Sequence, residues 1–150
     1  MSLRRAPVIA LSVGAFLVVS FFVARFLTQE NRERAAVTGL LRAQARGDAS
    51  AVLRSLSGCA RDAACRSLVE ADVRRLRRAG TLKILSYRSS TSSGLGSRRG
   101  PTRVAWDIGG IGVPVVQCVD VEHRGNVLLG DTIVLHGISA PIAGGALCPR

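Results

Sequence analysis

The feature that most restricts this sequence is an uninterrupted apolar run near its start. Residues 6–24 read APVIALSVGAFLVVSFFVA and contain no charged side chain. A helix rises about 1.5 Å per residue, so a run of this length is close to what crosses the ~30 Å hydrocarbon core of a bilayer. The run therefore predicts a transmembrane helix that holds the chain in a membrane through residues 6–27. Arg4 and Arg5 precede the run, and Arg25 closes it.

A cleavable signal peptide is the alternative interpretation of this run. Signal peptides have an apolar core of about 7–15 residues, followed by a small-x-small cleavage site. Here the run is longer, its end reads FVARF, and no cysteine follows closely for lipid modification. We therefore expect residues 1–27 to be an N-terminal tail and an uncleaved signal anchor. The N-terminal arginines favour a tail that stays inside, which makes residues 28–150 the extracytoplasmic domain of a single-pass cell-membrane protein.

The remaining ~120 residues suit one folded domain. Apolar residues make up 47% of the chain and charged residues 21%, which argues against wholesale disorder. Residues 28–150 keep 18 basic residues against 10 acidic ones, a net charge of +8. Such a charge favours an acidic protein partner or an anionic lipid surface. We expect no nucleic-acid partner, because Tyr87 and Trp106 are the only aromatic residues beyond the anchor, too few for a base-stacking platform.

Four cysteines follow the apolar run: Cys59, Cys65, Cys118 and Cys148. An even number outside the cytoplasm predicts two disulfides, for which three pairings exist. Pairing near neighbours gives Cys59–Cys65 and Cys118–Cys148 as the preferred arrangement. A zinc site is the alternative, but it usually needs tighter paired spacings and nearby histidines. We expect no metal and no other cofactor.

Helical periodicity extends from Glu30 to about Ala79. The first helix is expected over residues 30–46, with Val37, Leu40 and Leu41 on one face and Gly47 as its stop. Asp48 is expected to cap a short second helix, and Asp62 a third. The third helix should end near Gly80 and bury one stripe, made of Cys65, Leu68, Val69, Val73 and Leu76.

Beyond Gly80 the period changes to two, which is typical of strands. Strands are expected over residues 82–89, 102–108, 113–123 and 127–137, with turns at residues 109–112 and 124–126 and a polar loop at residues 89–100. Val104, Trp106 and Ile108 should share one face of the second strand. Helices followed by an antiparallel meander predict an α+β domain, in which three helices pack on a curved antiparallel sheet of about four strands.

This order of elements resembles the nuclear transport factor two-like, or cystatin-like, cone fold. The resemblance covers residues 30–140, and the segment LLRAQARGDASAVLRSL resembles the opening of that family, where a helix ends in a Gly-Asp turn before the next. With the expected anchor, the chain also resembles the anchored envelope members of that superfamily, such as Mce-associated proteins and the inner-membrane scaffold subunits of type IV secretion systems. The resemblance implies a pocket between sheet and helices, where enzymes of the family place Asp, His or Tyr.

Two carboxylates are candidates for a ligand-binding pocket of this kind. Asp72 falls within the apolar arc of the third helix, where it could be a general base with a raised pKa or simply pair with Arg75, three residues on. Asp107 lies opposite the Trp106 face and is expected either at the pocket or in solvent. A small enzyme that uses a pocket carboxylate is therefore one alternative, and a small-ligand or lipid-binding cone is another.

Asp120, Glu122 and His136 could meet across the third and fourth strands, but an exposed charged strand face is the ordinary explanation. His123, beside a turn, is expected at the surface. The sequence contains no nucleophile elbow, HExxH motif, phosphate loop or dinucleotide fingerprint. We therefore predict no catalytic residues, and a non-catalytic interaction or scaffold domain of the cell envelope.

The arginines of the third helix are the expected contact residues of such a domain. Arg74 and Arg78 lie opposite the buried stripe on a helical wheel and Arg75 flanks it, while Glu70 is the one acid placed to neutralise an arginine of this helix. A solvated face is one explanation of this pattern. The other is that Arg74, Arg75 and Arg78 contact an anionic lipid surface or an acidic partner.

Overall fold

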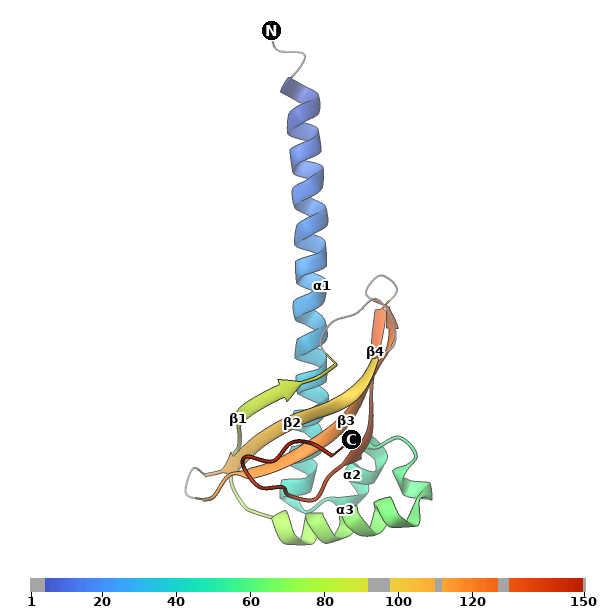
Figure 1. Cartoon of the computed structure of the whole chain (residues 1–150), viewed down its shortest axis with the longest axis vertical. Helices are drawn as coiled ribbons and strands as arrows, with labels where there is room; N and C mark the ends of the chain where they lie inside the picture. The colour runs from blue at the N-terminus through green and yellow to red at the C-terminus, as the bar shows by residue number, and fades with distance from the viewer. Residues whose placement is uncertain (1–4, 92–97, 110–111, 127–129, 150) are drawn as a thin grey trace.

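The computed structural model describes residues 5–91, 98–109, 112–126 and 130–149. A long helix, α1 (Arg5–Arg46), enters a small α+β domain, and its N-terminal half extends away from that domain (Figure 1). Three shorter helical segments follow: α2 (Ala49–Ser55), the 3₁₀ turn η1 (Cys59–Arg61) and α3 (Ala63–Leu76). The α+β class is confirmed, with the C-terminal half of α1 as the first of the domain's helices.

The predicted transmembrane anchor is wrong. Among the described residues, no helix is long and apolar enough to cross a membrane. The assignments as a membrane protein, signal anchor and single-pass cell-membrane protein are corrected accordingly.

The helix boundaries follow the expected capping residues. α1 ends at Arg46 because Gly47 adopts φ +83° and Asp48 N–H turns back to the Ala43 carbonyl at 3.0 Å. The Asp48 carboxylate then accepts the backbone N–H of Ala51 at 2.9 Å and starts α2. Asp62 caps α3 by accepting the N–H of Ala64 at 2.9 Å. The third helix ends at Leu76, three residues before the predicted end.

The sheet consists of four antiparallel strands in the order β1-β2-β3-β4. Their bounds are β1 Leu82–Ser89, β2 Arg98–Ile108, β3 Val115–Asn126 and β4 Gly130–Ile138. The turn predicted at residues 124–126 is wrong, because Arg124, Gly125 and Asn126 continue β3 and pair with Thr132, Asp131 and Gly130. The predicted loop at residues 89–100 is too long, because β2 begins at Arg98. Residues 92–97 of that loop and residues 110–111 of the turn predicted at 109–112 lie outside the described residues.

One face of the sheet packs with the helices to form the core. Trp106 is fully buried and its indole Nε1 donates to Gln117 Oε1 at 3.0 Å. The core also contains three residues of α1 and three of α3: Val37, Leu40, Leu41, Val69, Val73 and Leu76. Leu68, expected in the buried stripe, is 36% exposed. The apolar face of β2 was therefore predicted correctly, and the stripe of α3 in large part.

Candidate functional site

The most elaborate polar arrangement in the described structure surrounds Glu33 of α1. Glu33 precedes Val37 by four residues, so its side chain lies on the apolar face of the helix. The residue is 2% exposed. A buried carboxylate is stable only when its oxygens accept hydrogen bonds or meet a positive charge.

Five side chains approach the two carboxylate oxygens of Glu33. Oε1 accepts from Tyr87 Oη and Thr102 Oγ1, each at 2.7 Å. Oε2 accepts from Thr91 Oγ1 at 3.0 Å and Ser89 Oγ at 3.2 Å, and lies 2.7 Å from His123 Nε2. Because an ionised carboxylate can only accept, His123 Nε2 carries a proton in this contact. We call this set the Glu33 cluster; its members are Glu33, Tyr87, Ser89, Thr91, Thr102 and His123.

Sheet register brings these donors together from distant parts of the chain. Tyr87 and Ser89 are two residues apart on β1, so their side chains project from the same face. Ser89 pairs with Thr102 of β2, and Thr102 pairs with Val119 of β3. His123 lies four residues further along β3, so it projects from the same face as Val119. The cluster therefore lies on the core face of the sheet, beside the part of α1 that enters the domain.

The cluster keeps Glu33 ionised. Burial opposes the charge, but the hydrogen bonds from Tyr87, His123, Thr102 and Ser89 outweigh it and hold the pKa of Glu33 below its usual range. Burial, together with the neighbouring Glu33 carboxylate, raises the pKa of Tyr87 well above its usual range. The Arg34 guanidinium lies over the Tyr87 ring, 5.6 Å from its centroid. Tyr87 is thus a fixed donor and Glu33 a fixed anion.

This arrangement suits attachment better than proton transfer. A carboxylate offers about four lone-pair positions, and five donors already surround this one. A general base needs a free acceptor position and a pKa near the working pH. Glu33 has neither property, so the cluster joins α1 to β1, β2 and β3 rather than activating a substrate.

Sequence reasoning missed the Glu33 cluster, although a signal was present. Glu33, Val37, Leu40 and Gln44 recur at helical spacing, so an acid occupies a position on the apolar face. Thr102 and His123 likewise occupy core-face positions of their strands. His123 was expected at the surface, and its contact with Glu33 contradicts that expectation.

Asp72 is buried in α3, as its place in the apolar arc predicts. The residue is 5% exposed, and within the described structure its Oδ2 has no hydrogen-bond partner. Burial raises the pKa of Asp72, and the positive charge of Arg75 opposes that effect. Tyr87 and His123 would be natural partners for a catalytic acid, but both contact Glu33.

Asp107 lies on the face of β2 opposite Trp106 and is 5% exposed. Its Oδ1 accepts the backbone N–H of Ile108 at 2.7 Å and lies 4.0 Å from Arg78 Nη1. Among the described residues, no hydrogen bond or ion pair joins Asp107 to Asp72. The two candidate ligand-binding carboxylates therefore have separate neighbours.

Of the three strand residues considered as a cluster, Glu122 and His136 contact each other and Asp120 pairs elsewhere. His136 Nε2 lies 2.6 Å from Glu122 Oε2, and Arg124 Nη2 lies 3.0 Å from the same oxygen. Hydrogen bonds from Arg124 and His136 lower the pKa of Glu122 to about 2. Asp120 instead pairs with Arg99 at 2.6 Å. In the described part of the chain, no group of three His, Cys, Asp or Glu side chains could hold a metal ion.

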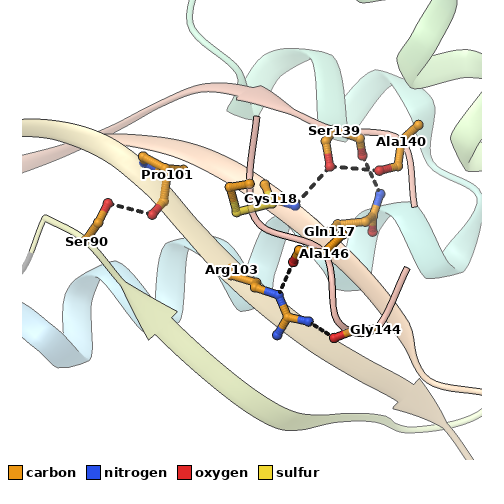
Figure 2. Close-up of a disulfide and its surroundings, with 10 residues drawn as sticks. Ser90, Pro101, Arg103, Gln117, Cys118, Ser139, Ala140, Gly144 and Ala146 are labelled. Atoms are coloured by element: carbon orange, nitrogen blue, oxygen red, sulfur yellow. Dashed lines mark hydrogen bonds between the residues drawn. A yellow bond between two sulfur atoms is a disulfide. The ribbon is translucent and has the colours of Figure 1, made fainter. Parts of the chain in front are cut away.

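Both disulfides have the preferred pairing. Cys59–Cys65 joins η1 to α3, and Cys118–Cys148 attaches the C-terminal tail to β3. Figure 2 shows how the tail is held further: Arg103 of β2 donates to the carbonyls of Ala146 and Gly144, and Ser139 Oγ accepts the backbone N–H of Cys118. The tail therefore crosses the sheet face opposite the core.

Arg74 and Arg75 lie in the last turn of α3, and Arg78 follows two residues after the helix ends at Leu76. Arg74, Arg75 and Arg78 all face solvent, and Arg78 has a weak contact with Asp107. Arg78 N–H also donates to the Ala45 carbonyl of α1 at 3.0 Å, so the C-terminal ends of α1 and α3 meet. The exposed Arg46 belongs to the same end of the domain. Cations near helix C-termini are favourable in themselves, which supplies a structural role for part of this charge.

Comparison of the chain with protein-family models, with curated proteins and with solved structures finds no match.

Proposed function

We propose that this chain is a non-catalytic interaction domain that works in an oxidising, extracytoplasmic compartment and binds an acidic protein partner. The observation that carries the proposal is the exposed arginine group at the C-terminal end of α3, formed by Arg74, Arg75 and Arg78. We call these three residues the α3 arginines. The two disulfides support the compartment, because such bonds persist where thiols are not kept reduced.

Several contacts favour binding over catalysis. Glu33 is surrounded by donors, Asp107 is engaged by a backbone N–H and by Arg78, and Glu122 is held by Arg124 and His136. Within the described structure Asp72 Oδ2 has no hydrogen-bond partner, and Tyr87 and His123 contact Glu33. An interaction domain needs a stable core and an exposed charged surface, and those are the features present.

The α3 arginines are suited to an acidic partner because their side chains are exposed, even though Arg78 lies 4.0 Å from Asp107 and Arg75 interacts with Asp72. No acid lies in the last turn of α3, while Arg74 and Arg75 occupy it. An exposed ion pair contributes about 0.5 kcal/mol, so three such pairs together give roughly a tenfold effect on a dissociation constant. Their contribution falls as salt rises, because the Debye length is ~8 Å at physiological ionic strength.

The test uses the full-length chain and polyglutamate as an acidic probe, with anionic phospholipid vesicles as a second arm. Arg74→Gln, Arg75→Gln and Arg78→Gln together should raise the dissociation constant for polyglutamate about tenfold. The matched control is Arg54→Gln, Arg61→Gln and Arg66→Gln, which changes the net charge equally at other exposed positions. Equal weakening by both triple variants would show that only net charge matters. Binding to the vesicles without binding to polyglutamate would replace the protein partner with a lipid surface.

A further inference from the structure

The two edges of the sheet differ in whether other segments of the described chain cover them. Along the β4 edge, Leu56 forms a bridge with Leu135, and Ser57 N–H donates to the Leu135 carbonyl at 2.7 Å. Past the end of β4 the tail continues beside β3, where Ile142 N–H donates to the Val116 carbonyl at 2.8 Å. The chain's own segments therefore cover much of this edge.

The β1 edge has no such cover in the described part of the chain. Among the described strands, β1 is the outermost of the sheet and pairs with β2 alone (Figure 1). An edge strand presents a row of unpaired N–H and C=O groups, which is a template for a strand from another chain. Strand addition at such an edge is a recurring mode of peptide recognition.

The side chains of β1 indicate what kind of strand the edge accepts. Lys83 and Arg88 are exposed, and the strand LKILSYRS contains no acid. Leu85 lies at the bulge between Ile84 and Ser86 and is 56% exposed. The edge thus offers an apolar centre flanked by two positive charges.

Neighbouring residues of β2 add to this charge at one end. Arg88 pairs with Arg103, and Lys83 pairs with Asp107, which Arg78 already approaches at 4.0 Å. A second copy of β1 laid along this edge would bring further Lys and Arg side chains to the same positive surface, and like charges on adjacent strands are destabilising. An acidic strand would instead form favourable cross-strand pairs.

We propose that the β1 edge binds an extended acidic segment of a partner protein, which adds to the sheet as a fifth strand with an apolar side chain near Leu85. This inference rests on the proposed role as an interaction domain. It uses a different element from the α3 arginines, and the two surfaces adjoin where Arg78 approaches Asp107, the β2 neighbour of Lys83. The bulge and the lysine limit indiscriminate edge pairing, so the acidic side chains supply selectivity and the backbone bonds supply affinity.

The test uses the full-length chain and a short synthetic peptide in which valine alternates with glutamate around a central leucine. The control peptide has lysine in place of glutamate. We expect the acidic peptide to bind at least tenfold more tightly, which is about 1.4 kcal/mol. Its binding should slow hydrogen exchange at the backbone amides of β1. Lys83→Glu with Arg88→Glu should reverse the preference between the peptides, and Arg61→Glu with Arg66→Glu, an equal charge change on η1 and α3, should not.

Four outcomes would overturn the inference. The first is equal binding of both peptides, and the second is binding without added protection of β1. The third is loss of binding when the α3 arginines are neutralised but not when Lys83 and Arg88 are reversed, which would keep the proposed function and remove the edge site. A change from dimer to monomer in the Lys83→Glu, Arg88→Glu variant would assign the edge to a second copy instead. Matching circular dichroism spectra and unfolding midpoints establish that the exposed substitutions leave the fold intact.

Discussion

The phenolic hydroxyl of Tyr87 in β1 donates a 2.7 Å hydrogen bond to Oε1 of Glu33 in α1, across 54 residues of sequence. Thr102 donates to the same oxygen from β2, also at 2.7 Å. These contacts lie where α1 enters the domain, so a buried anion helps to set the direction in which the N-terminal half of the helix leaves it. The Glu33 cluster is therefore a structural joint between helix and sheet.

Replacing Glu33 with glutamine should destabilise the fold by about 2–3 kcal/mol, because hydrogen bonds to a charged group contribute about 1.5–3 kcal/mol. The glutamine NH₂ group would also face side chains that now donate to the Glu33 carboxylate. Urea unfolding at pH 7 measures the loss. Glu30→Gln is the matched control, since Glu30 is exposed on the same helix and should change stability by less than about 0.5 kcal/mol. Similar values for the two variants would show that the Glu33 cluster adds nothing.

The effect of Glu33→Gln should depend on pH. The folded-state pKa of Glu33 is lowered, so its contribution is fully present above the unfolded-state pKa of about 4.3 and is lost as pH falls through the folded-state value. The difference between wild type and variant should be constant from pH 6 to 7 and shrink below about pH 4. Unfolding curves across that range measure it, and a difference that grew on acidification would contradict the lowered pKa.

Asp72→Asn should stabilise the protein at neutral pH, in the opposite sense to Glu33→Gln. The folded-state pKa of Asp72 is raised, so the stability linked to this group is fully present below its unfolded-state pKa of about 3.9 and is lost as pH rises through the folded-state value. The expected gain is on the order of 1 kcal/mol at pH 7, the usual scale for an unsatisfied buried group. Glu70→Gln on the same helix is the control. A loss of stability at pH 7 would mean that the Asp72 charge is favourable.

The disulfide that holds the tail should matter more than the one near α3. Cys118–Cys148 separates its cysteines by 30 residues and Cys59–Cys65 by 6. In the chain-entropy description the longer loop contributes ~3–4 kcal/mol and the shorter one ~2 kcal/mol. Serine pairs at each bridge, compared by thermal unfolding without reductant, measure both. A larger loss from the Cys59 and Cys65 pair would refute the entropic ranking.

Local signals in the sequence were enough to determine most elements of the domain. Asp48 and Asp62 cap α2 and α3, and Gly47 stops α1, because capping depends on residues within one turn. The buried face of β2 follows from its alternation, since side chains on a strand project to opposite faces in turn. The boundary of β3 was less accessible, because Gly125 indicates a turn and only pairing with Asp131 keeps it in the strand.

Among the three possible cysteine pairings the sequence favoured the one that joins near neighbours, and the structure confirms it. The membrane span that the apolar run predicted is wrong, because among the described residues no helix is long and apolar enough to cross a membrane. Only the tertiary structure decided the surroundings of the acids. Whether a carboxylate is a fixed anion, like Glu33, or has an oxygen without a hydrogen-bond partner in the described structure, like Asp72, depends on donors supplied from distant strands. Sheet register and helix packing place those donors, and neither is encoded within the few residues around an acid.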